Sequence, residues 1–147
     1  MKHPILLTCS LLATLLLQAC AAPGPAFTQL EPVPADKGHL YLYRQSALYG
    51  VAARYKVRAA DDTLLGELSN ASYLLLPLAP GAQRITVDEA ARIVEKACEL
   101  TVRPGQNQFF EYDSSAGLLL GWGALSRCVE RGEAEALPAL KQLNRAN

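Results

Sequence analysis

The stretch Ala53-Arg54-Tyr55-Lys56-Val57-Arg58-Ala59 decides the fold, because its apolar and charged side chains alternate. Tyr55 and Val57 share one face of an extended chain, and the three basic side chains share the other. A period of two is typical of a strand with one buried face and one solvated face. The stretch therefore predicts a strand of an antiparallel sheet.

The same alternation recurs on the C-terminal side, with turn residues at roughly every eighth to twelfth position. Pro80-Gly81 and Pro104-Gly105 suit type II turns, because proline presets φ at one central position and glycine accepts a positive φ at the next. We therefore expect an all-β fold, an antiparallel β-sandwich of about seven or eight strands. Besides the opening stretch, strands are expected at residues 63–68, 72–78, 83–88, 94–102 and 107–113.

The C-terminal residues 132–147 have apolar side chains at the spacing of an amphipathic helix. Pro138 lies among them, and proline is tolerated in the first turn of a helix, where its missing N–H has no helical partner. We therefore expect a short C-terminal helix that begins near Leu137.

The N-terminal residues 1–19 have the parts of an export signal. Lys2 supplies the positive charge, and the apolar run 5–17 is shorter than the roughly 20 residues that span a bilayer. The run leads to Leu17-Gln18-Ala19-Cys20, which resembles the lipobox of bacterial lipoproteins. The resemblance implies cleavage before Cys20, a diacylglycerol on its sulfur and acylation of the new amino group. The alternative is an ordinary secretory signal, cut near Ala21-Ala22.

Anchoring by several acyl chains is stable, because each buried CH₂ contributes about 0.8 kcal/mol. Ala21 follows the cysteine where an aspartate would imply retention, so the resemblance implies the outer membrane, on the side of the periplasm. Residues 20–37 are rich in proline and alanine, which favours an extended chain of about 3.1 Å per residue. We expect a tether that holds a domain of residues 38–147 up to roughly 50 Å from the bilayer.

Three further segments are similar to those of one known family: His39-Leu40-Tyr41-Leu42-Tyr43-Arg44-Gln45-Ser46-Ala47-Leu48-Tyr49-Gly50, Gly66-Glu67-Leu68-Ser69-Asn70-Ala71-Ser72-Tyr73 and Leu78-Ala79-Pro80-Gly81. Together they resemble the DUF2846 family of small bacterial envelope lipoproteins, over about residues 38–130. This family is similar to prealbumin-like and PEGA-like β-sandwiches and has no established activity. The resemblance implies fold and location only.

The domain keeps two thiols, Cys98 and Cys128, once Cys9 leaves with the signal and Cys20 carries lipid. An oxidising periplasm favours their pairing, and a bridge over about 30 residues contributes roughly 3 to 4 kcal/mol. Alternation along the last strand, which holds Cys128, raises a difficulty: if Val129 points into the core, Cys128 faces outward while Cys98 points inward. A bulge, or a reversed facing of that last strand, removes this conflict. We expect a disulfide; the alternative is two buried, inert thiols.

Composition excludes several classes of function. The chain has 14 basic and 14 acidic residues, whereas nucleic-acid binding needs a concentrated basic face. His39 is the only histidine beyond the signal, which excludes a His-based nucleophile pair and a two-His metal site; we place it at a strand start in contact with solvent. The acids Asp61-Asp62 and Glu133 with Glu135 are ordinary in a turn and at a helix start. We expect a protein that is not an enzyme and that binds no metal and no cofactor besides the covalent lipid on Cys20.

Two surfaces are candidates for a partner. The first is the basic face of Arg54, Lys56 and Arg58, which we expect to be a solvated strand face paired across strands with acids such as Glu95 and Glu99. The alternative is a face that meets lipid phosphates or an acidic partner.

The second surface is the apolar, glycine-interrupted stretch 116–125, which presents Leu118, Leu120 and Trp122. Exposed apolar patches often mark binding sites, although the same stretch also suits a strand bend that closes the end of the sandwich. We expect a non-enzymatic module that binds another envelope protein through a sheet edge or this loop. The alternative is a carrier of a small apolar ligand between the sheets.

Overall fold

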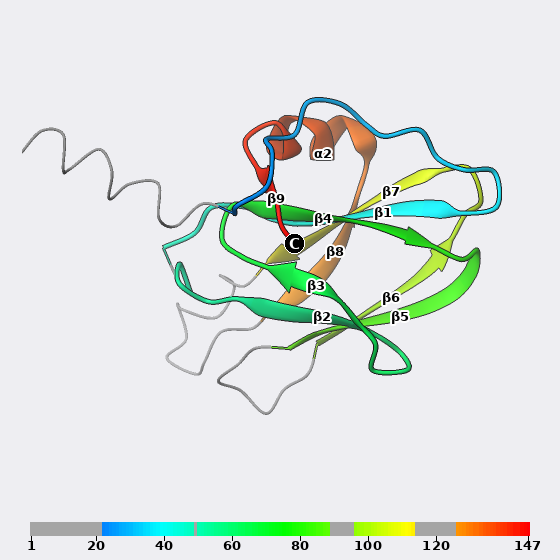
Figure 1. Cartoon of the computed structure of the whole chain (residues 1–147), viewed down its shortest axis with the longest axis horizontal. Coiled ribbons are helices and arrows are strands. Elements are labelled where there is room, and N and C mark those ends of the chain that lie inside the picture. The colour runs from blue at the N-terminus through cyan, green and yellow to red at the C-terminus, as the bar shows by residue number, and fades with distance from the viewer. Residues whose placement is uncertain (1–21, 49, 89–95, 114–125) are drawn as a thin grey trace, which may run out of the picture.

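The computed structural model describes residues 22–48, 50–88, 96–113 and 126–147. Within these ranges two β-sheets pack face to face, and a short helix lies on the outer side of one of them (Figure 1). The elements are β1 (Gly38–Arg44), β2 (Tyr55–Ala59), β3 (Leu64–Leu68), β4 (Ser72–Leu78), β5 (Gly81–Asp88), β6 (Lys96–Val102), β7 (Asn107–Asp113), β8 (Arg127–Arg131), α2 (Glu133–Leu140) and β9 (Asn144–Arg145).

One sheet has five strands in the order β8-β7-β1-β4-β9, and the other has four in the order β3-β2-β5-β6. Most neighbouring strands are antiparallel, whereas β1 runs parallel to β7 and β4 parallel to β9. The long pairing of β1 with β4 extends from Gly38 opposite Leu78 to Arg44 opposite Ser72. The all-β sandwich with a C-terminal helix that the alternation predicts is confirmed.

The core between the sheets follows the period of two. Tyr55 and Val57 of β2 point into it as predicted, and so do Ile85 and Val87 of β5. Their main partners in the core are Leu40, Leu42, Leu68, Leu74, Leu76, Cys98, Leu100, Val102, Phe110 and Tyr112.

A second core covers the outer face of the five-stranded sheet, so that β1 is buried along its whole length. Tyr41 and Tyr43 point from β1 to this side, opposite to their neighbours Leu40 and Leu42. The covering layer is made by α2 and by the chain that precedes β1 (Figure 1). We call this second cluster the outer core and the one between the sheets the inner core. The buried residues of the outer core are Phe27, Tyr41, Tyr43, Tyr73, Leu75, Phe109, Ala136, Leu140 and Leu143.

The helix α2 begins at Glu133, so the predicted start near Leu137 is wrong. Two amides of its first turn donate to the carbonyl of Gly132, at 3.0 and 2.9 Å, and hold this start. Pro138 lies inside the helix and removes one donor, but the helix ends soon after it, and Leu140 is fully buried on the sheet. In the described ranges no helix is long and apolar enough to cross a membrane.

The segment 22–37 lies along the domain, in contrast to the extended spacer that its composition predicts. The amide of Gly24 donates to the carbonyl of Arg145 at 3.1 Å, and the amide of Phe27 donates to that of Leu143 at 3.0 Å. Phe27 is buried among the aromatic residues of the outer core. The segment packs because it satisfies the exposed backbone edge of β9 and buries an apolar ring at the same time.

Candidate functional site

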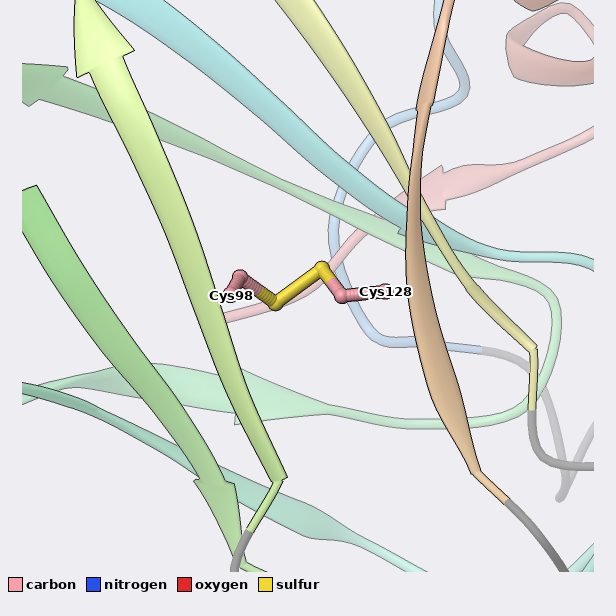
Figure 2. The surroundings of a disulfide bond; sticks show 2 residues. All are labelled: Cys98 and Cys128. Atoms are coloured by element: carbon pink, nitrogen blue, oxygen red, sulfur yellow. A yellow bond between two sulfur atoms is a disulfide. The ribbon is translucent and has the colours of Figure 1, made fainter.

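The two thiols of the domain form a disulfide, Cys98–Cys128, with their Cα atoms 5.5 Å apart (Figure 2). It joins β6, an edge strand of the four-stranded sheet, to β8, an edge strand of the five-stranded sheet. Cys128 stands opposite Tyr112, whose ring belongs to the inner core, so Cys128 faces inward and Val129 faces away. The reversed facing of this strand resolves the conflict that alternation raises.

A buried amide closes the same side of the sandwich. Gln108 of β7 is only 5% exposed, and its Nε2 donates to the carbonyl of Thr101 at 3.0 Å. Its Oε1 accepts from the amide of Arg103 at 2.9 Å. The outer backbone edge of β6 is therefore satisfied at this point by a side chain of the other sheet, and a partner would meet side chains here in place of free strand backbone.

An open groove of about 620 Å³ lies beside this closed side. Two ion pairs flank it, one between Arg103 and Glu130 at 3.7 Å and one between Arg84 and Glu99 at 3.9 Å. All four side chains are more than half exposed, so a partner can reach them and exchange these ion pairs for its own. The groove suits a polar protein surface of mixed charge.

Arg44 is the largest fully buried side chain of the described chain, at 1% exposed. It ends β1, and alternation places it on the inner face with Leu40 and Leu42. Its guanidinium carbon lies 4.9 Å from the centroid of the Tyr55 ring, and its Nη2 donates to the carbonyl of Gly50 at 3.0 Å. A cation over an aromatic face is attractive, especially away from water.

The loop between β1 and β2 takes its shape from this cation. Gly50 has a φ of 64°, and a Cβ there would lie 2.9 Å from the hydroxyl of Tyr55 and 3.2 Å from Nη2 of Arg44. The Tyr55 ring in turn packs against Tyr112, with centroids 5.1 Å apart. The alternation Leu40, Leu42, Arg44 is the sequence signal for a buried arginine, although it does not show which carbonyl the arginine holds.

The tyrosines of the outer core stay protonated at neutral pH. Burial raises the pKa of Tyr43 to about 12, with a further rise from the nearby Glu111 carboxylate. Burial also raises the pKa of Tyr41 and that of Tyr73. Glu111 accepts a hydrogen bond from Arg131 at 2.9 Å, which raises the pKa of that guanidinium. These groups serve packing and ion pairing.

His39 is buried, at 6% exposed, so the prediction that it contacts solvent is wrong. The reason is that β1 is the central strand of a sheet covered on both faces. Asp61 accepts from the amide of Thr63 at 3.1 Å, and this bond lowers its pKa; it shapes a turn, as predicted. The described ranges contain no group of three His, Cys, Asp or Glu side chains placed to hold a metal ion.

The basic face of β2 is only partly neutralised. Arg58 pairs with Asp88 at 3.1 Å and with Asp62 at 3.6 Å. Glu99 pairs with Arg84 of β5, so the suggested pairing of Glu99 with the basic stripe is wrong. Glu95 lies outside the described residues. Arg54 and Lys56 are exposed and form no ion pair with any residue that the structure describes.

Four other candidate residues, Cys20, Leu118, Leu120 and Trp122, lie outside the described residues. The segment that holds the last three starts after Asp113, at the end of β7, and returns at Ser126, just before β8. Ser126 is buried, at 4% exposed.

Two face-to-face sheets with a helical cover on one outer face define a small β-sandwich domain. The chain belongs to the family DUF2846, described as a protein of unknown function, whose model matches residues 34–121 and so more than half of the chain. The match includes Arg44 and Cys98 but ends before Cys128 and α2. Neither a curated protein nor a solved structure matches the chain.

Proposed function

We propose that this chain is a lipoprotein of the bacterial envelope, acylated on Cys20 and held in the outer membrane on the side of the periplasm. The observation that carries the proposal is Leu17-Gln18-Ala19-Cys20 at the end of an apolar run. The Cys98–Cys128 disulfide supports export, because disulfides persist in oxidising compartments and are rare in the cytosol.

The anchored domain is proposed to be a non-enzymatic module, with no cofactor besides the covalent lipid, that binds another envelope protein. Two surfaces support this role: the groove beside β6, lined by charged side chains of both signs, and the apolar stretch with Leu118, Leu120 and Trp122. Complementary charges across an interface favour recognition of a particular partner.

Mass spectrometry of the N-terminal peptide tests the anchoring. We expect the peptide to begin at Cys20 and to carry acyl groups, and a Cys20→Ser variant to leave the membrane fraction without them. An unmodified peptide, or a start at another residue, would contradict the proposal.

Photo-crosslinking in intact cells tests the partner. A photoreactive amino acid is placed at Thr101 in the groove, at Trp122 in the apolar stretch and at the exposed Leu64 as a control. We expect one defined protein adduct from Thr101 or Trp122 and none from Leu64. The adduct from Thr101 should disappear with Arg84→Glu, and that from Trp122 with a second change, Leu120→Ser. Equal labelling from all three positions would contradict a specific partner.

A further inference from the structure

The proposed lipid anchor and the folded domain have almost no chain between them. Ala22 is buried, at 5% exposed, and belongs to the inner core. Its carbonyl accepts a hydrogen bond from Nδ2 of Asn144 at 3.4 Å. Cys20 lies only two residues earlier, so even a fully extended chain separates the two Cα atoms by about 7 Å. A domain on such a short connection lies against the membrane surface.

Hydrogen bonds identify the end of the sandwich that this connection brings to the membrane. Asn144, whose side chain binds Ala22, also donates its backbone N–H to the carbonyl of Ala71 at 3.4 Å. Asn70, the residue before Ala71, accepts a hydrogen bond with its side-chain Oδ1 from the backbone N–H of Ala47 at 3.0 Å. One turn, at the start of β4, therefore connects the first described residue to the loop between β1 and β2.

We call this the anchor end: Ala22, the turn at residues 70–71, and the loop residues 45–48 and 50–53. Figure 1 shows the start of the described chain, in blue, at the same end of the molecule as the loop between β1 and β2. The groove beside β6 extends toward the opposite end, where Gly81 pairs with Val102.

The anchor end presents an unburied apolar side chain. Leu48 is 96% exposed, far more than Leu64 at 51% and Val51 at 43%, the other large exposed apolar residues of the described chain. Val51 belongs to the same loop, whereas Leu64 begins β3 at the opposite end, after the turn that follows β2. The loop that carries Leu48 is held by the bond between Arg44 and the carbonyl of Gly50.

We propose that the anchor end rests on the phospholipid headgroup layer and that the Leu48 side chain enters the bilayer interface beside the lipid on Cys20. This inference rests on the proposed function, because it needs the acylated cysteine. Apolar side chains next to an anchor gain by entering the acyl boundary, and a basic side chain at the surface is attracted to anionic headgroups. Arg54, exposed just beyond the loop, supplies that charge.

Quenching by brominated lipids tests the orientation. Leu48→Trp and, as the matched control, Leu64→Trp are each made in the full chain with Trp122→Phe, which removes the only tryptophan. The acylated proteins are reconstituted into vesicles of phosphatidylethanolamine and phosphatidylglycerol, with or without acyl-brominated phosphatidylcholine. We expect bromine to lower the Leu48→Trp emission about twofold and to leave the Leu64→Trp emission almost unchanged, because only the former lies at acyl depth.

A measurement on the unaltered protein avoids any effect of the substitutions. Hydrogen exchange of the acylated chain in vesicles is compared with exchange in detergent micelles too small to cover the anchor end. We expect slower exchange in vesicles at residues 45–53 and no change at residues 60–64.

The outcomes separate the inference from the proposed function. An acylated protein that floats with the vesicles, but whose Leu48→Trp emission is quenched no more than that of Leu64→Trp, overturns the orientation and leaves the anchor intact. A chain without acyl groups on Cys20 that stays with the soluble fraction overturns the proposed function and the orientation together.

Discussion

At the scale of a residue, Arg44 shows how one buried cation organises the loop that follows it. Its guanidinium lies over the Tyr55 ring and donates to the carbonyl of Gly50. Replacing it by alanine removes the cation–π contact, leaves the half-buried Gly50 carbonyl without this donor and opens a cavity. We therefore expect Arg44→Ala to lower the free energy of unfolding by about 3 kcal/mol, measured by urea denaturation.

The control for this change is Arg54→Ala, an exposed arginine that forms no ion pair with the described residues. It should change the free energy of unfolding by less than about 0.5 kcal/mol. Similar small losses for both variants would mean that Arg44 contributes no more than a surface charge.

The tyrosines of the outer core make stability depend on alkaline pH. In the folded state burial raises the pKa of Tyr43 from 10.0 to about 12, whereas in the unfolded chain the hydroxyl ionises near 10. The contribution of this shift is therefore fully present below pH 10 and is lost as the pH rises toward 12. At 1.36 kcal/mol per pKa unit the loss is about 2 to 3 kcal/mol, with smaller additions from Tyr41 and Tyr73.

Tyr43→Phe removes the titrating group and keeps the ring. We expect its free energy of unfolding to fall less steeply than that of the unaltered chain between pH 10 and 12, while both proteins have similar stability near pH 8. Parallel pH profiles in urea titrations would show that the Tyr43 hydroxyl does not contribute.

At the scale of an element, the segment before β1 is part of the folded domain. The Phe27 ring meets Tyr41 and Tyr73 edge to face, with centroid distances of 6.1 and 5.6 Å. We expect Phe27→Ala to lower the free energy of unfolding by about 3 kcal/mol, as for other buried aromatic residues. Gln29→Ala, an exposed change in the same segment, should have almost no effect. If the segment were a free tether, Phe27→Ala would be as silent as Gln29→Ala in thermal and urea unfolding.

The disulfide acts at the same scale, because it ties the edge strands β6 and β8 of different sheets. It closes a loop with a sequence separation of 30 residues, for which chain entropy gives about 3 to 4 kcal/mol. We expect the Cys98→Ala and Cys128→Ala double variant to lose about this much stability in urea. Dithiothreitol should lower the stability of the native chain similarly and leave the double variant unchanged; an unchanged unfolding midpoint on reduction would contradict a role for the bridge.

The elements also show what a sequence can predict here. Strands β2, β5 and β6 follow from alternation and neighbouring turns, which are local properties of the chain. The start of α2 and the packing of residues 22–37 depend on a distant surface, the outer face of the five-stranded sheet, which composition does not reveal. The pairing of Cys98 with Cys128 follows from the expected compartment, but the facing of β8 is decided by its register with Tyr112.

At the scale of the whole molecule, the short connection from Cys20 to the core gives the domain one orientation at the proposed membrane. Eight Gly and Ser residues inserted between Ala21 and Ala22 leave Leu17-Gln18-Ala19-Cys20 and Ala21 in place, so acylation should be unchanged. A flexible chain of this length has a typical reach of about 16 Å, which frees the anchor end from the headgroups.

We expect this insertion to remove at least about half of the quenching of Leu48→Trp by brominated lipids, since the interface burial of one leucine is too weak to hold a domain on its own. Flotation with the vesicles should persist, because the lipid still anchors the chain. Full quenching after the insertion would instead mean that the loop with Leu48 and Arg54 binds the bilayer by its own affinity, and that the short connection does not set the orientation.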